Sequence, residues 1–135
     1  MPLYSKTSMG RLEECHPDLQ TIFKEVVKYF DNTIMCGHRG EQDQNEAFEK
    51  GFSKLKFPQS KHNKTPSLAV DAVPYPVDWK DTKRMIHFAG YVMGIAKLLK
   101  DRGIIEKNLR WGGDWDKDTE LKDNKFQDYP HFELY

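Results

Sequence analysis

The chain has 135 residues, of which 38% are hydrophobic and 13% aromatic, so it is long enough to bury a core and too aromatic to be disordered. Its 21 basic and 21 acidic side chains cancel at pH 7, which excludes the basic excess typical of nucleic-acid-binding proteins. The longest apolar stretch, residues 88–99, is interrupted by glycine, tyrosine and lysine and falls short of the ~20 apolar residues of a membrane span. We therefore expect one domain over residues 1–135, with no nucleic-acid partner and no membrane insertion.

The N-terminus and the cysteines indicate the compartment. No basic stretch followed by an apolar segment opens the chain, so we predict no signal peptide and synthesis in a cytoplasm. Cys15 and Cys36 lack the close spacing of a metal-binding pair and are too few for a disulfide framework. They are expected to be buried or half-buried free thiols, with a single bridge as the alternative.

The first predicted element is an amphipathic helix that opens at Pro17 and ends near residues 31–32. Its apolar positions follow helical spacing: Leu19, Ile22, Phe23, Val26, Val27 and Phe30. A short strand at residues 33–36 then runs into a glycine-flanked turn at 37–40, which carries a histidine and an arginine. This turn therefore presents two polar side chains at the end of a strand.

The middle of the chain contains a second helix, a loop and a strand. Asp43 is placed to cap a helix that extends to about Lys54. Residues 55–65 are polar and contain proline, which is typical of a loop. The apolar run at 68–73 has the length of a strand, but it contains a carboxylate.

The last third of the chain holds a long helix and two short strands. Asp81 caps the helix and Gly103 ends it, and its buried stripe comprises Met85, Phe88, Ala89, Val92, Met93, Ala96 and Leu99. Residues 109–111 and 132–134 are short strand candidates, separated by a polar, aspartate-rich loop at 112–128. Helices and strands mix without regular alternation, which predicts an α+β fold with helices packed on a small, mainly antiparallel sheet.

Three side chains could hold a metal ion. Burying an ionised Asp71 in an apolar strand carries a large desolvation free energy unless a cation or several hydrogen-bond donors contact the carboxylate. His62 precedes that strand and His131 borders the last one, and two imidazoles with one carboxylate form a complete protein ligand set for catalytic zinc. The same residues could instead form a structural Asp–His hydrogen-bonded pair, and spacing alone leaves both interpretations open.

Several segments carry further motifs in a fixed order along the chain. These are Gly37-His38-Arg39 with Gln44 and Gly51, Ser60-Lys61-His62, Ala69-Val70-Asp71, Trp111-Gly112-Gly113-Asp114-Trp115, and Asp128-Tyr129-Pro130-His131-Phe132-Glu133. Together they resemble the VanY-like family of zinc D,D-carboxypeptidases and L-alanyl-D-glutamate peptidases. The resemblance runs from about Thr33 to Tyr135, which is most of the chain.

The resemblance implies roles for five residues. His62, Asp71 and His131 match the zinc ligands, Asp128 matches the catalytic acid/base, and Arg39 matches the arginine that faces the substrate carbonyl. One departure concerns the pattern S-x-H-x-x-G-x-A-x-D, in which seven positions separate the two ligands, whereas nine separate them here. A longer loop can bulge while both ligands keep their places, so the departure bears on the shape of the loop.

Other roles stay open. From the sequence alone, a surface salt bridge of Arg39 with Glu41 or Asp43 is favoured over a catalytic role. Trp111 and Trp115 could belong to the core or wall a cleft, and Asp114 could orient a ligand histidine. No role is assigned to His38.

The function implied by the resemblance is zinc-dependent hydrolysis of the stem peptide of bacterial peptidoglycan. A small catalytic chain without a signal or a wall-binding module resembles a bacteriophage endolysin that cuts the L-Ala–D-Glu bond. We expect a monomer that is held in the host cytoplasm and reaches the wall after the membrane is permeabilised. The alternatives are a D,D-carboxypeptidase that removes terminal D-alanine and a non-enzymatic metal-binding or wall-binding domain.

Overall fold

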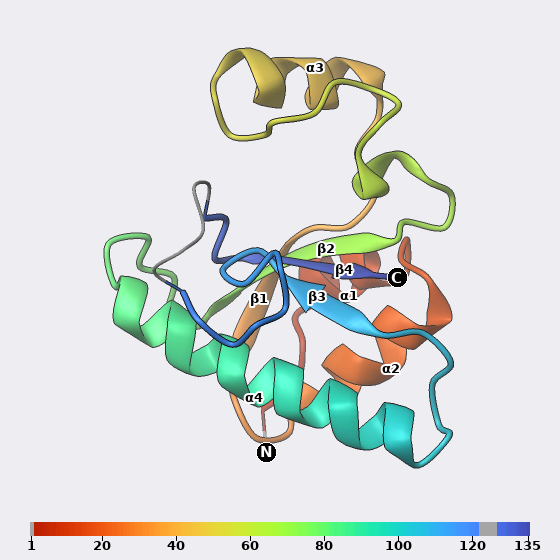
Figure 1. The fold of residues 1–135 in the computed structure, drawn as a ribbon, viewed down its shortest axis with the longest axis vertical. Helices are drawn as coiled ribbons and strands as arrows, with labels where there is room; N and C mark the ends of the chain where they lie inside the picture. The colour runs from red at the N-terminus through yellow and green to blue at the C-terminus, as the bar shows by residue number, and fades with distance from the viewer. Residues whose placement is uncertain (1, 122–126) are drawn as a thin grey trace.

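The computed structural model describes residues 2–121 and 127–135, and its centre is a four-stranded antiparallel sheet. The strands follow the order β1 (Asn32–Cys36), β2 (Ala69–Pro74), β4 (His131–Leu134) and β3 (Leu109–Trp111). The helices are α1 (Lys6–Leu12), α2 (Pro17–Val26), α3 (Glu41–Glu49), the single 3-10 turn η1 (Lys61–Asn63) and α4 (Thr82–Asp101). The predicted α+β class is confirmed, and Figure 1 shows the elements in place.

The two faces of the sheet differ because side chains alternate along a strand. Val70 and Ala72 of β2 and Phe132 and Leu134 of β4 belong to the hydrophobic core beneath the sheet. Phe132 packs edge-on against the rings of two helical residues, Phe23 of α2 and Phe88 of α4. The alternate positions on these strands face away from that core, and they hold Asp71, His131 and Glu133.

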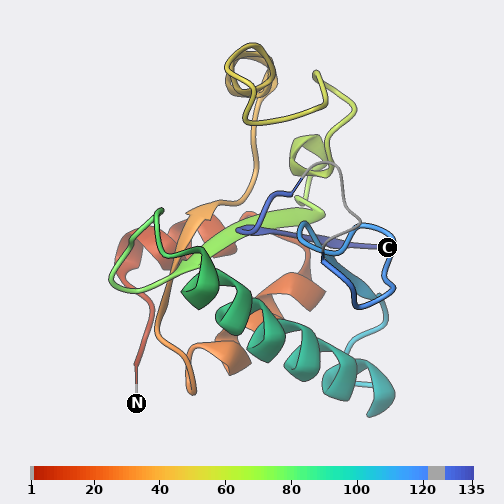
Figure 2. The same cartoon turned by 60° about the vertical axis from the view of Figure 1, so that its left-hand side comes forward.

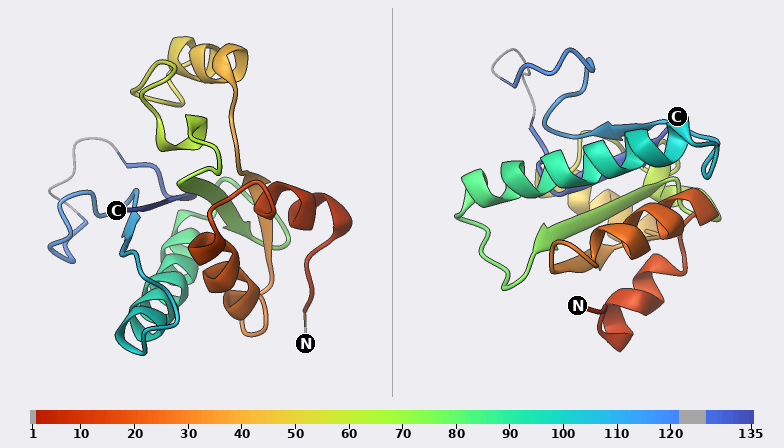
Figure 3. Two further views of the ribbon diagram at one scale, coloured as in Figure 1. Left: turned by 90° about the vertical axis from the view of Figure 1, so that its right-hand side faces the viewer. Right: turned by 90° about the horizontal axis from the view of Figure 1, so that it is seen from below.

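An arm, residues 40–60, projects from the sheet on the side opposite α2 and α4. Figure 2 shows this arm, which contains α3, standing above the sheet while the two longer helices lie below it. The fully buried Gln44 ties the arm together, because its amide donates to the Ser53 hydroxyl (2.9 Å) and to the Leu55 carbonyl. The view from the side in Figure 3 shows η1 between the arm and the sheet.

Most of the predicted elements are present. The α2 helix begins at Pro17, and the His16 ring accepts a hydrogen bond from the Asp18 amide at the helix start. The α4 helix has the Asp81 cap, and Gly103 follows its end with a positive φ of 73°. Strong apolar periodicity and caps are local signals, so they locate such helices without tertiary information.

Several element boundaries differ from the prediction, among them the end of α3, which lies at Glu49 and not near Lys54. The α2 helix ends at Val26, short of the predicted end near residues 31–32. The apolar residues that follow lie in a turn and still pack on the core, where the Phe30 ring contacts that of Phe88. The α3 helix spans Glu41–Glu49 and starts at Gly40 without a side-chain cap, so the prediction that Asp43 caps it is wrong. Helix α1 was not predicted, since seven residues are too few to show a clear period.

Both cysteines are free thiols, as predicted, with Cys15 buried and Cys36 half-buried. Among the residues described, none of the helices combines the length and the apolar character needed to cross a membrane.

Candidate functional site

Three candidate ligand atoms converge on the face of the sheet opposite the core. Asp71 Oδ1 lies 3.2 Å from His62 Nε2 and 3.3 Å from His131 Nδ1, and these two nitrogens are 3.3 Å apart. Ligands placed ~2.0–2.1 Å from a tetrahedral zinc ion would be about 3.3–3.4 Å from one another. The spacing of the three atoms therefore fits a tetrahedral metal with one position left open.

The strand register brings two of these residues together. Asp71 of β2 is the direct cross-strand partner of His131 of β4, so their side chains emerge side by side on the same face. His62 arrives from η1, where the Ser60 hydroxyl accepts a hydrogen bond from the His62 amide. The Arg39 amide donates to the His62 carbonyl (2.8 Å), which ties η1 to the segment after β1.

Hydrogen bonds on the outer side of each imidazole decide which nitrogen faces the centre. His62 Nδ1 lies 2.7 Å from the Gly37 carbonyl, which can only accept, so Nδ1 carries the proton. His131 Nε2 lies 2.8 Å from the Glu133 carboxylate and donates in the same way. The inward nitrogens and Asp71 Oδ1 can then act as three lone-pair donors towards a metal ion between them.

The pKa values of His62 and Asp71 depend on how close the two side chains lie. Burial disfavours a charged His62, but the adjacent Asp71 carboxylate outweighs it and raises the pKa of His62 to about 10. Burial would also raise the pKa of Asp71, and the two histidines instead hold it well below its usual range. A metal ion and a proton therefore compete for the same atoms.

Glu133 is a functional candidate for which the sequence analysis predicted no role. Its carboxylate is buried, accepts from His131 and from Arg110 Nη2 (2.6 Å), and lies 3.5 Å from Lys61 Nζ. Burial alone would raise the pKa of Glu133, but the bonds from His131 and Arg110 lower it to about 2. The sequence could have indicated Glu133, because it lies two residues after His131 and residues i and i+2 of a strand share a face.

Within residues 2–121 and 127–135, Arg39 forms no salt bridge with Glu41 or Asp43 and instead pairs with Asp71. Its Nη2 donates to Asp71 Oδ2 (3.3 Å), the oxygen that does not face the histidines, and its Nη1 donates to Gln44 Oε1 (3.1 Å). Gln44 Oε1 also accepts from Asn63, while the Gln44 amide nitrogen donates to two groups of the arm. Gln44 thus uses its whole hydrogen-bonding capacity, and one of its four bonds holds Arg39 beside the centre.

Asp128 lies at the open edge of the centre, with Oδ2 4.0 Å from His131 Nδ1. Its backbone packs tightly on Gly112, where a Cβ would lie 2.1 Å from the Asp128 carbonyl oxygen. The Asp128 amide also donates to the Gly112 carbonyl (2.8 Å). Burial, together with the negative charge of Asp71, raises the pKa of Asp128 to about 6, which suits a group that exchanges protons near neutral pH.

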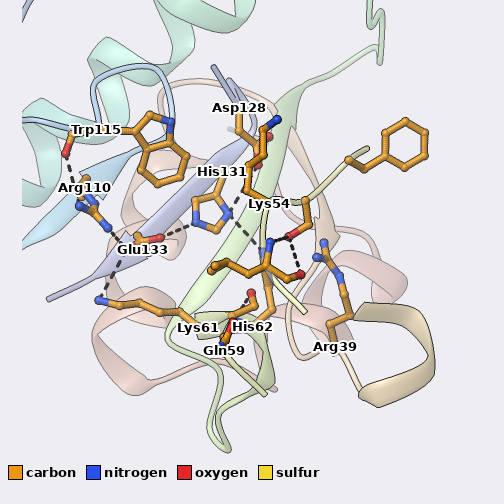
Figure 4. A pocket seen from close by; sticks show the side chains of 14 residues that line it. Arg39, Lys54, Gln59, Lys61, His62, Arg110, Trp115, Asp128, His131 and Glu133 are labelled. Carbon is orange, nitrogen blue, oxygen red and sulfur yellow. Dashed lines mark hydrogen bonds and ion pairs between the residues drawn. The ribbon is translucent and has the colours of Figure 1, made fainter. Parts of the chain in front are cut away.

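A cavity of about 500 Å³ opens onto the centre (Figure 4). Arg39, His62, Asp128 and His131 line it, so two of the three candidate ligands and both candidate catalytic residues face the same space. Trp115 also lines the cavity, and its ring lies against that of His131 with 5.4 Å between centroids.

The remaining residues with open roles lie away from the reacting atoms. Trp111 belongs to the hydrophobic core and donates from Nε1 to the Tyr129 carbonyl (2.7 Å). Asp114 does not orient a ligand histidine through any hydrogen bond seen in residues 2–121 and 127–135, and its carboxylate accepts from the amides of Asp118 and Thr119. His38 is exposed and lines neither this cavity nor the second, larger one that holds Asp71.

Comparison with known proteins identifies a family and a similar solved structure. Residues 3–135 match the family described as phage L-alanyl-D-glutamate peptidase. The fold is similar to the crystal structure of the L-Ala D-Glu endopeptidase ChiX of Serratia marcescens, with a TM-score of 0.69 and 26% sequence identity. That alignment covers 98% of this chain and 89% of the Serratia chain.

Proposed function

The chain belongs to the family of phage L-alanyl-D-glutamate peptidases and is a peptidoglycan endopeptidase of the endolysin type, and we propose that it works as a zinc enzyme. In this proposal His62, Asp71 and His131 bind one zinc ion, and Asp128 and Arg39 carry out catalysis within a single catalytic domain. The observation that carries the proposal is the convergence of three lone-pair donors at 3.2–3.3 Å, the spacing of tetrahedral zinc ligands.

Zinc bound there would polarise the scissile carbonyl and lower the pKa of a water molecule in its open position towards ~7. Asp128 is placed to accept a proton from the attacking water at Oδ2 and to return it to the amine of the leaving D-glutamyl residue.

Arg39 is placed to stabilise the negative charge that develops on the carbonyl oxygen of the scissile bond. A guanidinium offers five N–H donors, more than its bonds to Asp71 and Gln44 use. Those two bonds hold the planar group in one orientation before substrate binds, and such preorganisation is the basis of oxyanion stabilisation.

The shape of the site supports cleavage inside a chain over removal of a terminal residue. A second cavity of about 710 Å³ shares Arg39 and Asp128 with the first, so open space lies on both sides of the candidate centre. A D,D-carboxypeptidase must instead bind a free terminal carboxylate on one side. Family membership also argues against the non-enzymatic alternative.

Zinc analysis and product analysis of digested peptidoglycan test the proposal together. We expect about one zinc per chain, loss of wall hydrolysis on treatment with a chelator, and recovery when zinc is added back. His62→Ala and His131→Ala should lose both zinc and activity, whereas His38→Ala, an exposed histidine outside the cavities described, should keep both.

Mass spectrometry of the released fragments identifies the bond. We expect new N-terminal D-glutamate and a fall in the turbidity of a wall suspension. Release of D-alanine without a fall in turbidity would support the carboxypeptidase alternative. Near-full zinc occupancy in both histidine variants would contradict the ligand assignment.

The enzyme acts on the cell wall. We further propose that it is a monomer that accumulates in the host cytoplasm and meets its substrate only after the membrane is permeabilised. Fractionation of expressing cells before and after addition of a pore-forming agent tests the location. Size-exclusion chromatography with light scattering tests the monomeric state.

A further inference from the structure

The candidate centre lies where two cavities meet. Arg39, Phe52 and Asp128 line both of them. The first cavity, of about 500 Å³, extends along η1 and the end of the arm. The second, of about 710 Å³, extends towards the loop between β2 and α4, where Trp79 lies. A substrate that passes through the centre therefore has one half in each cavity.

The first cavity is cationic. Lys54, Lys61 and Arg110 line it, and Glu133 is the one carboxylate of its lining besides Asp128. Lys61 and Arg110 share Glu133, so three positive charges face one negative charge in this part of the lining. A cleft lined by an excess of one sign attracts ligand groups of the opposite sign.

The second cavity is aromatic and uncharged beyond the residues of the centre itself. Of the eight lining residues outside the centre, five are aromatic or large and apolar: Phe52, Trp79, Met85, Tyr129 and Pro130. Phe52 comes from the arm and Trp79 from the loop after β2, so aromatic side chains approach this cavity from two separate segments.

Phe52 and Trp79 remain exposed to solvent, at 72% and 54% of their surface. Large exposed apolar side chains that line a concave surface are typical of a ligand-binding groove. The second cavity therefore offers exposed apolar side chains to a ligand.

The substrate of the proposed function is equally asymmetric. The half that leaves as the amine begins with D-glutamate, which carries a free carboxylate besides the one that continues the peptide. The acyl half has the methyl group of L-alanine and then the uncharged N-acetylmuramyl sugar, whose carboxyl group is used up in the amide bond. One half is thus anionic and the other is neutral with apolar surface.

On this basis, and resting on the proposed function, we propose the direction in which the substrate binds. The D-glutamyl half lies in the cationic cavity with its free carboxylate near Lys54, and the muramyl-alanyl half lies in the aromatic cavity with the sugar against Trp79. The opposite direction would place a carboxylate against uncharged aromatic walls, where its lost hydration is not compensated. It would also leave the cationic cavity facing a neutral sugar.

Trp79→Ala and Lys54→Gln test this direction with three synthetic substrates. The first is N-acetylmuramyl-L-alanyl-γ-D-glutamyl-lysine, the second is the same peptide with an acetyl group in place of the sugar, and the third has the free D-glutamyl carboxylate converted to an amide. Tyr29→Ala and Lys24→Gln are matched controls, because both side chains are exposed on or just after α2, away from both cavities.

We expect Trp79→Ala to reduce kcat/KM at least tenfold on the sugar-bearing peptide and less than twofold on the sugar-free one. Lys54→Gln should reduce kcat/KM at least fivefold on the carboxylate substrate and less than twofold on the amide. Trp79→Phe, which keeps an aromatic ring, should recover most of the activity on the sugar-bearing peptide. Zinc content and circular dichroism of every variant show whether it is folded.

Binding of the product N-acetylmuramyl-L-alanine, followed by NMR, is a second readout that does not depend on turnover. Its affinity should fall in Trp79→Ala and stay unchanged in Lys54→Gln. The exchanged pattern, in which Trp79 discriminates carboxylate from amide and Lys54 discriminates the sugar, would reverse the proposed direction. Equal effects on all substrates, or none, would overturn the proposal. Failure of the wild-type enzyme to cleave any of these peptides would instead count against the proposed function.

Discussion

Replacing Glu133 by glutamine tests whether the buried carboxylate behind His131 supports metal binding. The side chain keeps its size, but the 2.8 Å bond from His131 Nε2 loses its charge-assisted acceptor. Charged hydrogen bonds are worth about 1.5–3 kcal/mol and neutral ones about 0.5–1.5 kcal/mol. The glutamine amide can also turn its NH₂ towards His131, which would move the proton to Nδ1, the nitrogen that faces the centre.

Both effects weaken the same ligand, so we expect zinc affinity to fall by about 10- to 100-fold, the usual range for a group that orients a ligand histidine. This corresponds to about 1.4–2.8 kcal/mol. At a zinc concentration ~1,000 times the wild-type Kd, zinc stabilises the fold by about 4.1 kcal/mol. In Glu133→Gln this stabilisation should decrease to between about 2.7 and 1.4 kcal/mol.

Two measurements establish the effect. A competition titration against a chromogenic chelator gives the zinc affinity, and urea unfolding with and without zinc gives the zinc-dependent stabilisation. The comparison of the two unfolding curves separates metal binding from the intrinsic loss of stability that follows removal of a buried charge beside Arg110. Glu25→Gln is the matched control, because Glu25 forms an exposed ion pair with Lys28 (2.9 Å) and should leave zinc binding unchanged. Zinc affinity of Glu133→Gln within twofold of wild type would refute the reasoning.

Three further predictions concern catalysis and stability. Asp128→Asn should keep zinc and its melting temperature but lose about 10²-fold or more in wall hydrolysis, and wild-type turnover in a zinc-loaded variant would exclude Asp128 as the proton carrier. Gln44→Ala should leave zinc affinity unchanged while kcat/KM falls about tenfold, because Arg39 loses the acceptor that orients it; a parallel loss of zinc would indicate a general structural defect instead. Burial, with a smaller effect of Cys36, raises the pKa of Cys15 to about 12. The stability that the neutral thiol provides is therefore complete below ~8.5, the pKa of an unfolded cysteine, and is lost as the pH rises towards 12. Urea unfolding from about pH 9 to about pH 11 should show wild type losing about 1.4 kcal/mol per pH unit more than Cys15→Ala, and parallel curves would contradict this.

Local patterns were sufficient for much of the fold. Helix α4 was predicted with its cap at Asp81 because an apolar stripe, a capping carboxylate and a terminal glycine all act within a few residues. Helix α1 was missed because its seven residues owe their place to packing against β1, where Arg11 donates to the Ile34 carbonyl (3.0 Å). A short helix depends on such contacts more than on its own sequence.

The candidate ligands could be named from the sequence because residue type and motif order carry that information. A carboxylate within an apolar strand is unusual wherever that strand lies, so Asp71 was identifiable before its neighbours were known. The motifs around His62 and His131 then supplied the two imidazoles. Their roles stay predictions until zinc is measured, but the structure does bring the three side chains to one point.

Only the tertiary structure could decide how these residues are arranged. Asp71 and His131 are separated by 60 positions and meet because β2 and β4 pair in one particular register. A shift of that register by one residue would turn His131 away from the centre, since successive side chains of a strand point to opposite faces. The tertiary structure also decides how Glu133 and Gln44 are bound. Both stand in the motifs quoted from the sequence, but the ion pair of Glu133 with Arg110 of β3 and the hydrogen bond of Gln44 with Asn63 of η1 join segments that lie 23 and 19 positions apart.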